Sequence, residues 1–157
     1  MKVLNKVVIG MASLVLLTGC MSKTGYSDFH SKAVEAEEKA PEYKKATAKG
    51  EIITTILSAE TKVTVDCKFV KNSDGDWEVD GENIDGALVA IFYLNYRASM
   101  VGDSGDYTYY AGSGGFKATS KNEDSAASYV FNKFGYPTSV KGKSESGNVN
   151  LKFTWAK

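Results

Sequence analysis

The sequence predicts an α+β domain, in which an antiparallel β-sheet packs against one or two helices and could curve into a half-barrel. Three observations support this fold class. Apolar and polar residues alternate along several segments, most clearly over 61–70 and 149–155. Turn residues rich in glycine separate these segments. Two further stretches repeat apolar residues at intervals of three and four, which is the spacing of a helix.

The first helix is expected directly after Tyr26. Ser27 or Asp28 can act as its N-cap. The apolar positions that recur at helical spacing are Phe29, Ala33, Ala36 and Ala40. Pro41 should end this helix, because proline lacks the amide hydrogen that an interior position must donate.

The next segments have strand character. Gly50 is expected to interrupt the chain before a β-branched strand at 52–57. Within 61–70, Val63, Val65, Cys67 and Phe69 alternate with polar residues and should face the core. Residues 72–75 form a turn, and 76–80 return as the partner of a hairpin. The carboxylates in 74–82 suggest calcium, but Trp77 occupies the position where an EF-type loop needs glycine, so a solvated turn is predicted.

Residues 87–101 favour a helix, and a strand remains the alternative because 89–96 is rich in β-forming residues. Two apolar stripes run along this helix, so it is expected to be buried on two sides. One stripe is Ala87, Ile91, Leu94, Ala98 and Val101, and the other is Val89, Phe92, Tyr93 and Tyr96. From residue 106 onward, alternation and glycine-containing turns predict a β-meander that ends with 149–155.

The opening residues have the composition of an export signal. Lys2 and Lys6 precede an apolar run over 7–17, and the run closes with Leu17-Thr18-Gly19-Cys20. Eleven residues are too few to cross a bilayer, since a spanning helix needs roughly 20. The segment resembles the type II signal of bacterial lipoproteins. That resemblance implies cleavage before Cys20, a diacylglyceryl group on its sulfur, and attachment to the extracytoplasmic face of the cell membrane or outer membrane.

This resemblance divides the chain into a signal peptide at 1–19, a lipidated polar tether at 20–26 and one α+β domain at 27–157. Loss of Lys2 and Lys6 from the 19 basic residues leaves 17 against 19 acidic residues. A chain so close to neutral is not expected to bind nucleic acid or to dock electrostatically on a membrane. With Cys20 modified, Cys67 is the remaining cysteine, so an internal disulfide is excluded and a buried, inert thiol is expected.

No catalytic residue, cofactor or metal site is predicted, and the chain is not expected to be an enzyme. Catalysis needs a base held against a nucleophile, paired carboxylates in a pocket or a metal cluster, and no motif of these kinds is present. The single histidine, His30, and the remaining cysteine cannot form a His/Cys metal site.

The aromatic residues suggest a binding surface for a hydrophobic or other small ligand. The candidate ligand-binding residues are Trp77, Phe92, Tyr96, Tyr107, Tyr109 and Tyr129. Ordinary packing of a β-sheet core is the alternative explanation for most of them. In element order and size the chain loosely resembles the half-barrel lipid and lipoprotein carriers of bacterial envelopes, which implies helix packed within a curved sheet.

Two hypotheses follow: a lipid-anchored binding module for a small ligand, and an interaction lipoprotein whose strand edge or aromatic face meets another envelope protein. An interior cavity of several hundred Å³ would favour the first hypothesis, and a filled core would count against it.

Overall fold

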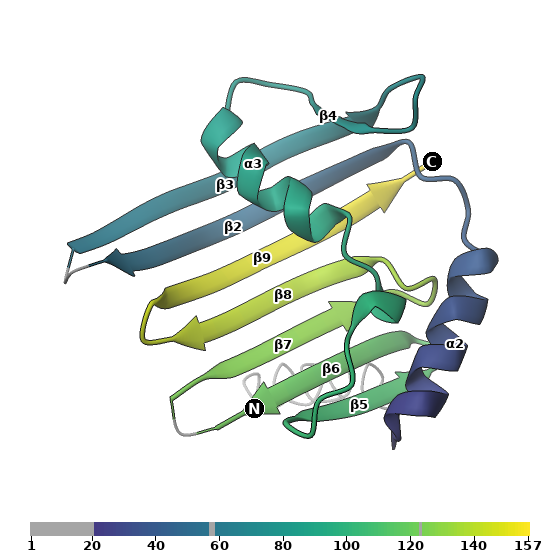
Figure 1. Cartoon of the computed structure of the whole chain (residues 1–157). Coiled ribbons are helices and arrows are strands. Elements are labelled where there is room, and N and C mark those ends of the chain that lie inside the picture. The colour runs from purple at the N-terminus through teal and green to yellow at the C-terminus, as the bar shows by residue number, and fades with distance from the viewer. Residues whose placement is uncertain (1–20, 57–58, 123) are drawn as a thin grey trace, which may run out of the picture.

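An open antiparallel β-sheet forms the body of the protein (Figure 1). The computed structural model describes residues 21–56, 59–122 and 124–157. Within these residues the sheet has nine strands in the order β1-β5-β6-β7-β8-β9-β2-β3-β4. The α+β class and the antiparallel pairing predicted from the sequence are confirmed, and the sheet does not close into a barrel.

The strands are β1 (Ser22–Thr24), β2 (Lys45–Ile56), β3 (Ala59–Lys71), β4 (Trp77–Val79), β5 (Tyr107–Gly112), β6 (Gly115–Lys121), β7 (Ala126–Phe131), β8 (Pro137–Ser144) and β9 (Gly147–Ala156). The helices are α2 (Tyr26–Glu38), α3 (Ile84–Leu94) and the short 3-10 helix η1 (Ala98–Met100).

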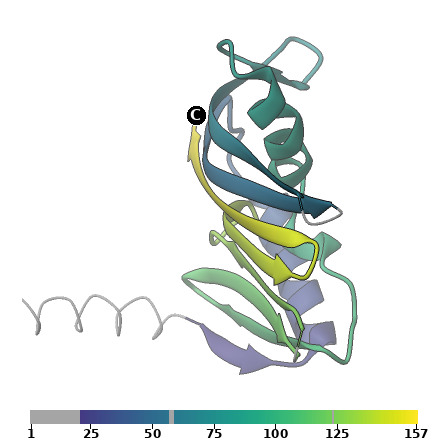
Figure 2. The ribbon, with the colours of Figure 1, turned by 90° about the vertical axis from the view of Figure 1, so that its left-hand side faces the viewer.

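Both helices cover the same face of the twisted sheet, as the side view shows (Figure 2). We call this the helix face, and we call the opposite surface of the strands the back face. α3 packs on Val65 and Cys67 of β3, which are buried as the alternation at 61–70 predicted. α2 buries Phe29 and Ala33 in a second cluster with Tyr109 and other residues of β5 to β7. The core is therefore two adjoining clusters filled by side chains.

Gly50 lies inside one long strand, so the expected interruption at this residue is wrong. β2 runs unbroken from Lys45 to Ile56 and pairs with both β3 and β9. The backbone φ of Gly50 is +147°, and a Cβ at this position would lie 1.9 Å from the carbonyl oxygen of Asn150. Gly50 is needed because β9 approaches too closely for any side chain.

The N-cap of helix α2 lies two residues before Ser27 and three before Asp28, the two caps expected from the sequence. Gly25 occupies the N-cap, and Asp28 lies in the first turn, where it accepts a hydrogen bond from Lys32 at 2.8 Å. The Lys32 and Thr24 hydrogen bonds lower the pKa of the Asp28 carboxyl. The helix ends at Glu38, before Pro41, as the proline predicted.

Helix α3 confirms the helical alternative for its segment but ends at Leu94. Asn83 caps its N-terminus, with Oδ1 accepting from the amide of Gly86 at 3.0 Å. The expectation that α3 is buried on two sides is wrong, because Leu88 is 67% and Phe92 68% exposed. Small residues explain this geometry: Gly86, Ala87 and Ala90 let the helix lie close to β3 on one narrow face.

The segment expected as a polar tether contains a strand. Ser22–Thr24 forms β1 and pairs with β5 at an edge of the sheet. If Cys20 is lipidated, the anchor is therefore only two residues from the sheet, which reaches at most about 7 Å. The predicted signal peptide and Cys20 lie outside the described residues.

Candidate functional site

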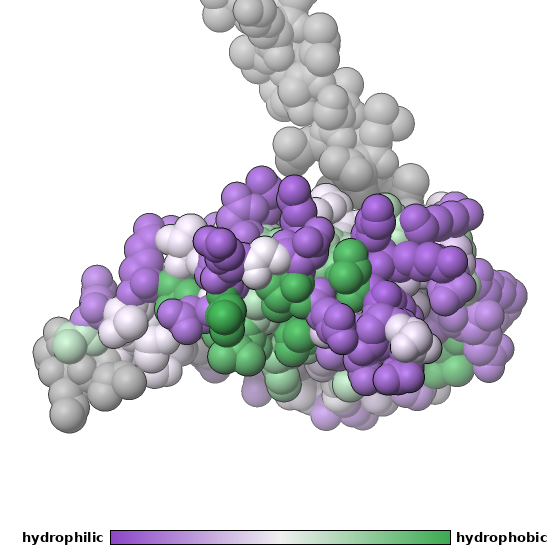
Figure 3. Space-filling view, turned by 90° about the horizontal axis from the view of Figure 1, so that it is seen from above, coloured by the Kyte–Doolittle hydropathy of each residue, from purple (hydrophilic) through white to green (hydrophobic). Residues whose placement is uncertain are grey.

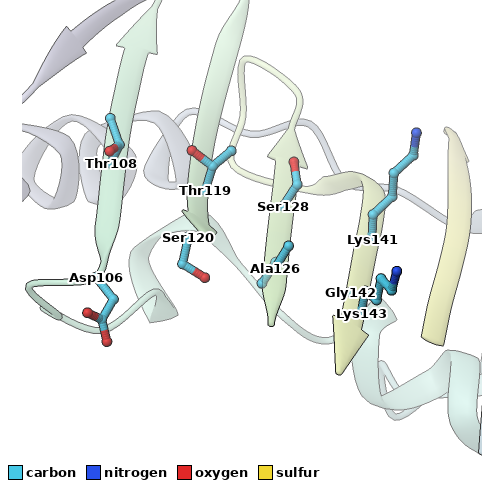
Figure 4. Close-up of a pocket in the computed structure, with 10 residues that line it drawn as sticks. Asp106, Thr108, Thr119, Ser120, Ala126, Ser128, Lys141, Gly142 and Lys143 are labelled. Carbon is cyan, nitrogen blue, oxygen red and sulfur yellow. The ribbon is translucent and has the colours of Figure 1, made fainter. Parts of the chain in front are cut away.

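The back face carries an open groove of about 540 Å³ across β5 to β8 (Figure 4). Its lining residues are Asp106, Thr108, Thr119, Ser120, Ala126, Ala127, Ser128, Lys141, Gly142 and Lys143. The strand register explains how they meet, because Thr108, Thr119, Ser128 and Lys141 pair in turn on adjacent strands. A row of hydroxyl groups thus leads to a lysine.

Hydroxyl groups lie along the otherwise largely apolar lining of the groove, and charged side chains lie at both ends. Asp106 lies at the β5 end, whereas Lys141 and Lys143 lie on β8 at the other end (Figure 4). Hydroxyl groups donate and accept hydrogen bonds, and an ammonium group donates to anionic oxygens. These groups suit a polar, anionic ligand better than an apolar one. None of these residues was among the sequence candidates, because the groove exists only once four strands lie side by side.

Four of the six aromatic candidates converge on the helix face. The ring centroids of Tyr96 and Tyr129 lie 5.4 Å apart, those of Tyr107 and Tyr129 6.4 Å, and those of Tyr107 and Tyr109 6.1 Å. We call these four residues the tyrosine cluster. Tyr109 is buried and its hydroxyl donates to the carbonyl of Gly102 at 2.8 Å, so this residue also fixes the loop before β5.

Burial disfavours ionisation of two phenols in the tyrosine cluster. It raises the pKa of Tyr96 and of Tyr129, and neighbouring phenols that include Tyr107 raise both further. A phenol that stays protonated can donate a hydrogen bond. The cluster is therefore an apolar surface with hydroxyl donors rather than a source of phenolate base or nucleophile.

Tyr107 also borders a second open groove, of about 420 Å³, on the helix face. Ile52 and Val149 form its apolar side. The small residues Ala127 and Gly142, which pair on β7 and β8, also line it. This groove and the tyrosine cluster are the features closest to the predicted site for a hydrophobic ligand. The groove is open at the surface, whereas the tyrosines belong to or pack against the second core cluster. Both core clusters between sheet and helices are filled by side chains.

The other two candidates lie elsewhere. Trp77 is buried on β4, with its ring 5.7 Å from that of Trp155 and the Lys71 ammonium 5.4 Å from its centroid. It serves as core packing, the alternative weighed from the sequence. Phe92 lies on the outer side of α3 and contacts the ring of Tyr93. The sequence candidates therefore do not form one site.

Phe92 belongs to an exposed apolar stripe on α3. Ile84, Leu88 and Phe92 follow one another at four-residue spacing and are 63%, 67% and 68% exposed. Seen from the β4 side of the molecule, apolar side chains gather in the middle of a largely hydrophilic surface (Figure 3). We call these three residues the α3 stripe. Exposed apolar groups arranged in this way are typical of an interaction surface.

Acidic residues precede the α3 stripe in the sequence and lie at the start of its helix. Between Lys71 and Arg97 the sequence has no basic residue, and it carries the exposed carboxylates Asp74, Asp76, Glu78, Asp80, Glu82 and Asp85. The last two flank the start of α3.

An open strand edge lies beside the stripe. β4 pairs only with residues 69–71 of β3, so in the described structure residues 59–68 have a strand on just one side. The N-terminus of α3 contacts this edge, since Asn83 Nδ2 donates to the carbonyl of Thr64 at 3.1 Å. The amide of Asp80 also donates to the carbonyl of Lys68 at 2.8 Å, so two carbonyls of this edge already accept hydrogen bonds.

Arg97 is a residue that sequence reasoning missed. Its guanidinium lies 3.9 Å from the ring centroid of Tyr136 and donates to the carbonyl of Leu94 at 2.7 Å. Burial lowers its pKa. Arg97 thereby attaches the C-terminal end of α3 to the turn that precedes β8 and positions the stripe.

The structure supports the expectation that Cys67 is an unreactive core residue. Its side chain is 3% exposed, its thiol donates to the carbonyl of Asn83 at 3.5 Å, and burial raises its pKa. In residues 21–56, 59–122 and 124–157, no cluster of three or more histidine, cysteine or acidic side chains could hold a metal ion. Over the same part of the chain, no helix is long and apolar enough to cross a membrane.

Comparisons with protein-family models, with curated proteins and with solved structures give no match for this chain.

Proposed function

We propose that this chain is a lipid-anchored, extracytoplasmic interaction protein, and that the α3 stripe with the open edge of β3 binds another envelope protein. The observation that supports this proposal most strongly is the exposure of Ile84, Leu88 and Phe92 on one side of a capped, well-packed helix. A solvated helix would place polar residues at these positions.

The chemistry of the surface defines the partner. The stripe offers apolar contact, and Glu82 and Asp85 beside it favour lysine or arginine on the partner. The open edge of β3 offers backbone groups to an extended segment, as in β-strand addition. The partner segment is therefore apolar, extended or helical, and flanked by basic residues.

The anchor is the diacylglyceryl group expected on Cys20. Its two acyl chains make such an anchor stable, because each buried CH₂ contributes about 0.8 kcal/mol. Radiolabelled palmitate should enter the full chain in cells and should not enter the Cys20→Ala variant.

A small hydrophobic ligand is the second candidate. The groove beside Tyr107 supports it, because Ile52, Val149 and the tyrosine cluster present apolar surface with neutral hydroxyl donors. Native mass spectrometry of the gently extracted protein tests this candidate. A bound small molecule that is lost in a Tyr107→Ala variant would favour it over the protein partner.

A photoreactive phenylalanine analogue at position 92 tests the interaction surface in cells. We expect a discrete adduct with one envelope protein, which Leu88→Glu should abolish and Glu82→Lys should weaken. Val34→Glu is the matched control, since Val34 is a partly exposed apolar residue on α2. It should leave the adduct unchanged.

Three outcomes would overturn the proposal. Adducts that form only with lipid would make the stripe a membrane contact, and adducts with a second copy of the chain would make it a self-association surface. An adduct that survives Leu88→Glu would show that the stripe does not bind the captured protein.

A further inference from the structure

The back face of the sheet is rich in lysine. The strand registers place Lys23, Lys45, Lys49, Lys62, Lys68, Lys117, Lys141, Lys143 and Lys152 on this face. All of them are exposed except Lys117, which is half-buried with its ammonium 5.5 Å from the ring centroid of Tyr110. The face extends over the strands on both sides of the groove in Figure 4.

The carboxylates of this face lie mainly on β2, β3 and β4. In the described strands they are Glu51, Glu60, Asp66 and Glu78. Glu51 pairs with Lys62 at 2.5 Å and Asp66 with Lys49 at 3.4 Å. Around the groove the pattern differs: the cross-strand neighbours of Lys141 and Lys143 are serine, alanine and asparagine.

Fold stability does not account for this arrangement. Lys49 and Lys152 lie directly opposite each other on β2 and β9. Like charges at such a pair destabilise a sheet, and exposed faces ordinarily intersperse both signs. A concentration of lysine that is unfavourable for the fold points to an anionic partner.

The near-neutral total conceals a separation of charge. The segment at 74–85 carries six carboxylates and no basic residue and lies at the β4 side of the molecule, where Glu78 shares the back face. The nine lysines named above lie on the back face. An anionic surface would attract one side of the molecule and repel the other. The near-neutral net charge had instead predicted that the chain does not dock electrostatically on a membrane.

We propose that the back face docks on an anionic phospholipid surface, with Lys141, Lys143 and the hydroxyl row of the groove contacting a headgroup phosphate. This inference rests on the proposed lipid anchor, because the anchor brings the domain to the bilayer. Strand β1 begins two residues after Cys20 and pairs with β5, and β5 forms one side of the groove. The groove and the anchored edge therefore belong to the same part of the sheet.

The docked orientation serves the proposed function. Helices α2 and α3 lie on the side of the sheet away from the back face (Figure 2). With the back face on lipid, the α3 stripe points away from the bilayer toward a protein partner. A single anchored edge would leave the domain free to turn, and the lysines fix which side faces outward.

Lysine labelling in vesicles tests the docking. The lipidated protein is reconstituted into phosphatidylcholine vesicles with and without phosphatidylglycerol. A water-soluble, amine-reactive reagent then labels the lysines, and mass spectrometry measures the labelled fraction of each one. With phosphatidylglycerol we expect labelling of Lys141, Lys143 and Lys152 to fall about fivefold or more, since one lysine near an anionic surface gains about that factor in partition. Lys32 and Lys39 on α2 are the internal controls.

Salt and charge reversal separate electrostatic docking from simple crowding. About 1 M salt, where the screening length is about 3 Å, should restore the labelling. Lys141→Glu/Lys143→Glu should remove most of the protection of Lys152, whereas Lys32→Glu/Lys39→Glu should not. Equal protection on pure phosphatidylcholine, or protection of the α2 lysines instead, would overturn the inference.

The two proposals fail in different ways. If the chain does not float with phosphatidylcholine vesicles, the proposed lipid anchor is wrong. The docking is then tested separately, because the same chain added to phosphatidylglycerol vesicles must still show salt-sensitive protection of its back-face lysines. Two further arms replace the vesicles with inorganic phosphate or a DNA duplex. Protection by phosphate alone, or stronger protection by the duplex than by vesicles, would each overturn docking on lipid.

Discussion

Gly50 shows how one residue sets the spacing of three strands. It lies in the middle of β2 between β3 and β9, and the missing side chain leaves room for the carbonyl of Asn150. Its positive φ belongs to a region that residues with a side chain rarely adopt.

Gly50→Ala should lower the free energy of unfolding by about 2 kcal/mol or more, because the new Cβ meets backbone that cannot move aside and the φ is strained. Urea denaturation followed by circular dichroism measures the change. Gly105→Ala is the control, since no atom lies within 4 Å of the Cβ position there, and it should be nearly neutral. Equal stability of the two variants would contradict the model of close approach.

Single residues were predictable where the local pattern decides their environment. The two-residue period placed Val65, Cys67 and Phe69 in the core, and all three are buried. Arg97 was not predictable in the same way, because its partners Tyr136 and Trp155 lie far along the chain. A basic residue just after a helix is a weak signal for a contact with the last carbonyls, and it was available.

Helix α3 depends on its first turn. Asn83 bonds the amide of Gly86 and the carbonyl of Thr64, so it both caps the helix and attaches it to β3. The small residues Gly86 and Ala87 follow, and Gly86 itself is close to β3: a Cβ there would lie 2.8 Å from the Thr64 oxygen.

Asn83→Ala should cost about 1 kcal/mol of stability, the usual effect of losing an N-cap side chain. Asn83→Asp keeps the acceptor for the Gly86 amide and should retain most of the stability. Thermal unfolding of the three proteins at neutral pH measures both changes. A loss in the Asp variant as large as that in the Ala variant would show that the bond to Thr64, which both variants lack, matters more than the cap.

Elements were predictable in type more than in extent. The hairpin at 72–75, the meander after 106 and both helices were expected and are present. The continuous strand through Gly50 and the early end of α3 were not, because a distant strand and a contact from Arg97 decide them. The burial of α3 was also misjudged, since apolar composition cannot tell a core face from an exposed one.

At the scale of the molecule, Tyr129 connects the two core clusters and packs against both. Burial raises the pKa of its phenol and of Tyr93 and Tyr96. The folded protein therefore binds these protons more tightly than the unfolded chain does.

The stability contributed by the neutral phenols of Tyr93, Tyr96 and Tyr129 should be constant below pH about 10, the pKa of an unfolded tyrosine. The free energy of unfolding should fall as the pH rises above that value. Unfolding by urea at several alkaline pH values measures the slope. Tyr129→Phe removes one ionisable group while keeping the ring, so it should flatten the dependence. An unchanged slope in this variant would exclude Tyr129 as a source.

The arrangement of the whole molecule was the least predictable level. The sequence implied an antiparallel sheet, and its strand order follows from the pairing of β2 with β9, which joins residues about a hundred positions apart. The basic back face depends on that order. A net charge calculated from composition could not reveal this face, because composition does not say on which surface each charge lies.

The pairing of β2 with β9 also bears on export. If the chain crosses a membrane from its N-terminus onward, β2 emerges early, and the strand that joins the two halves of the sheet emerges last. Contacts between residues so distant in sequence form slowly. In a chain exported in this way, the sheet could be completed only after β9 had crossed the membrane, so the two halves of the sheet would join on the far side.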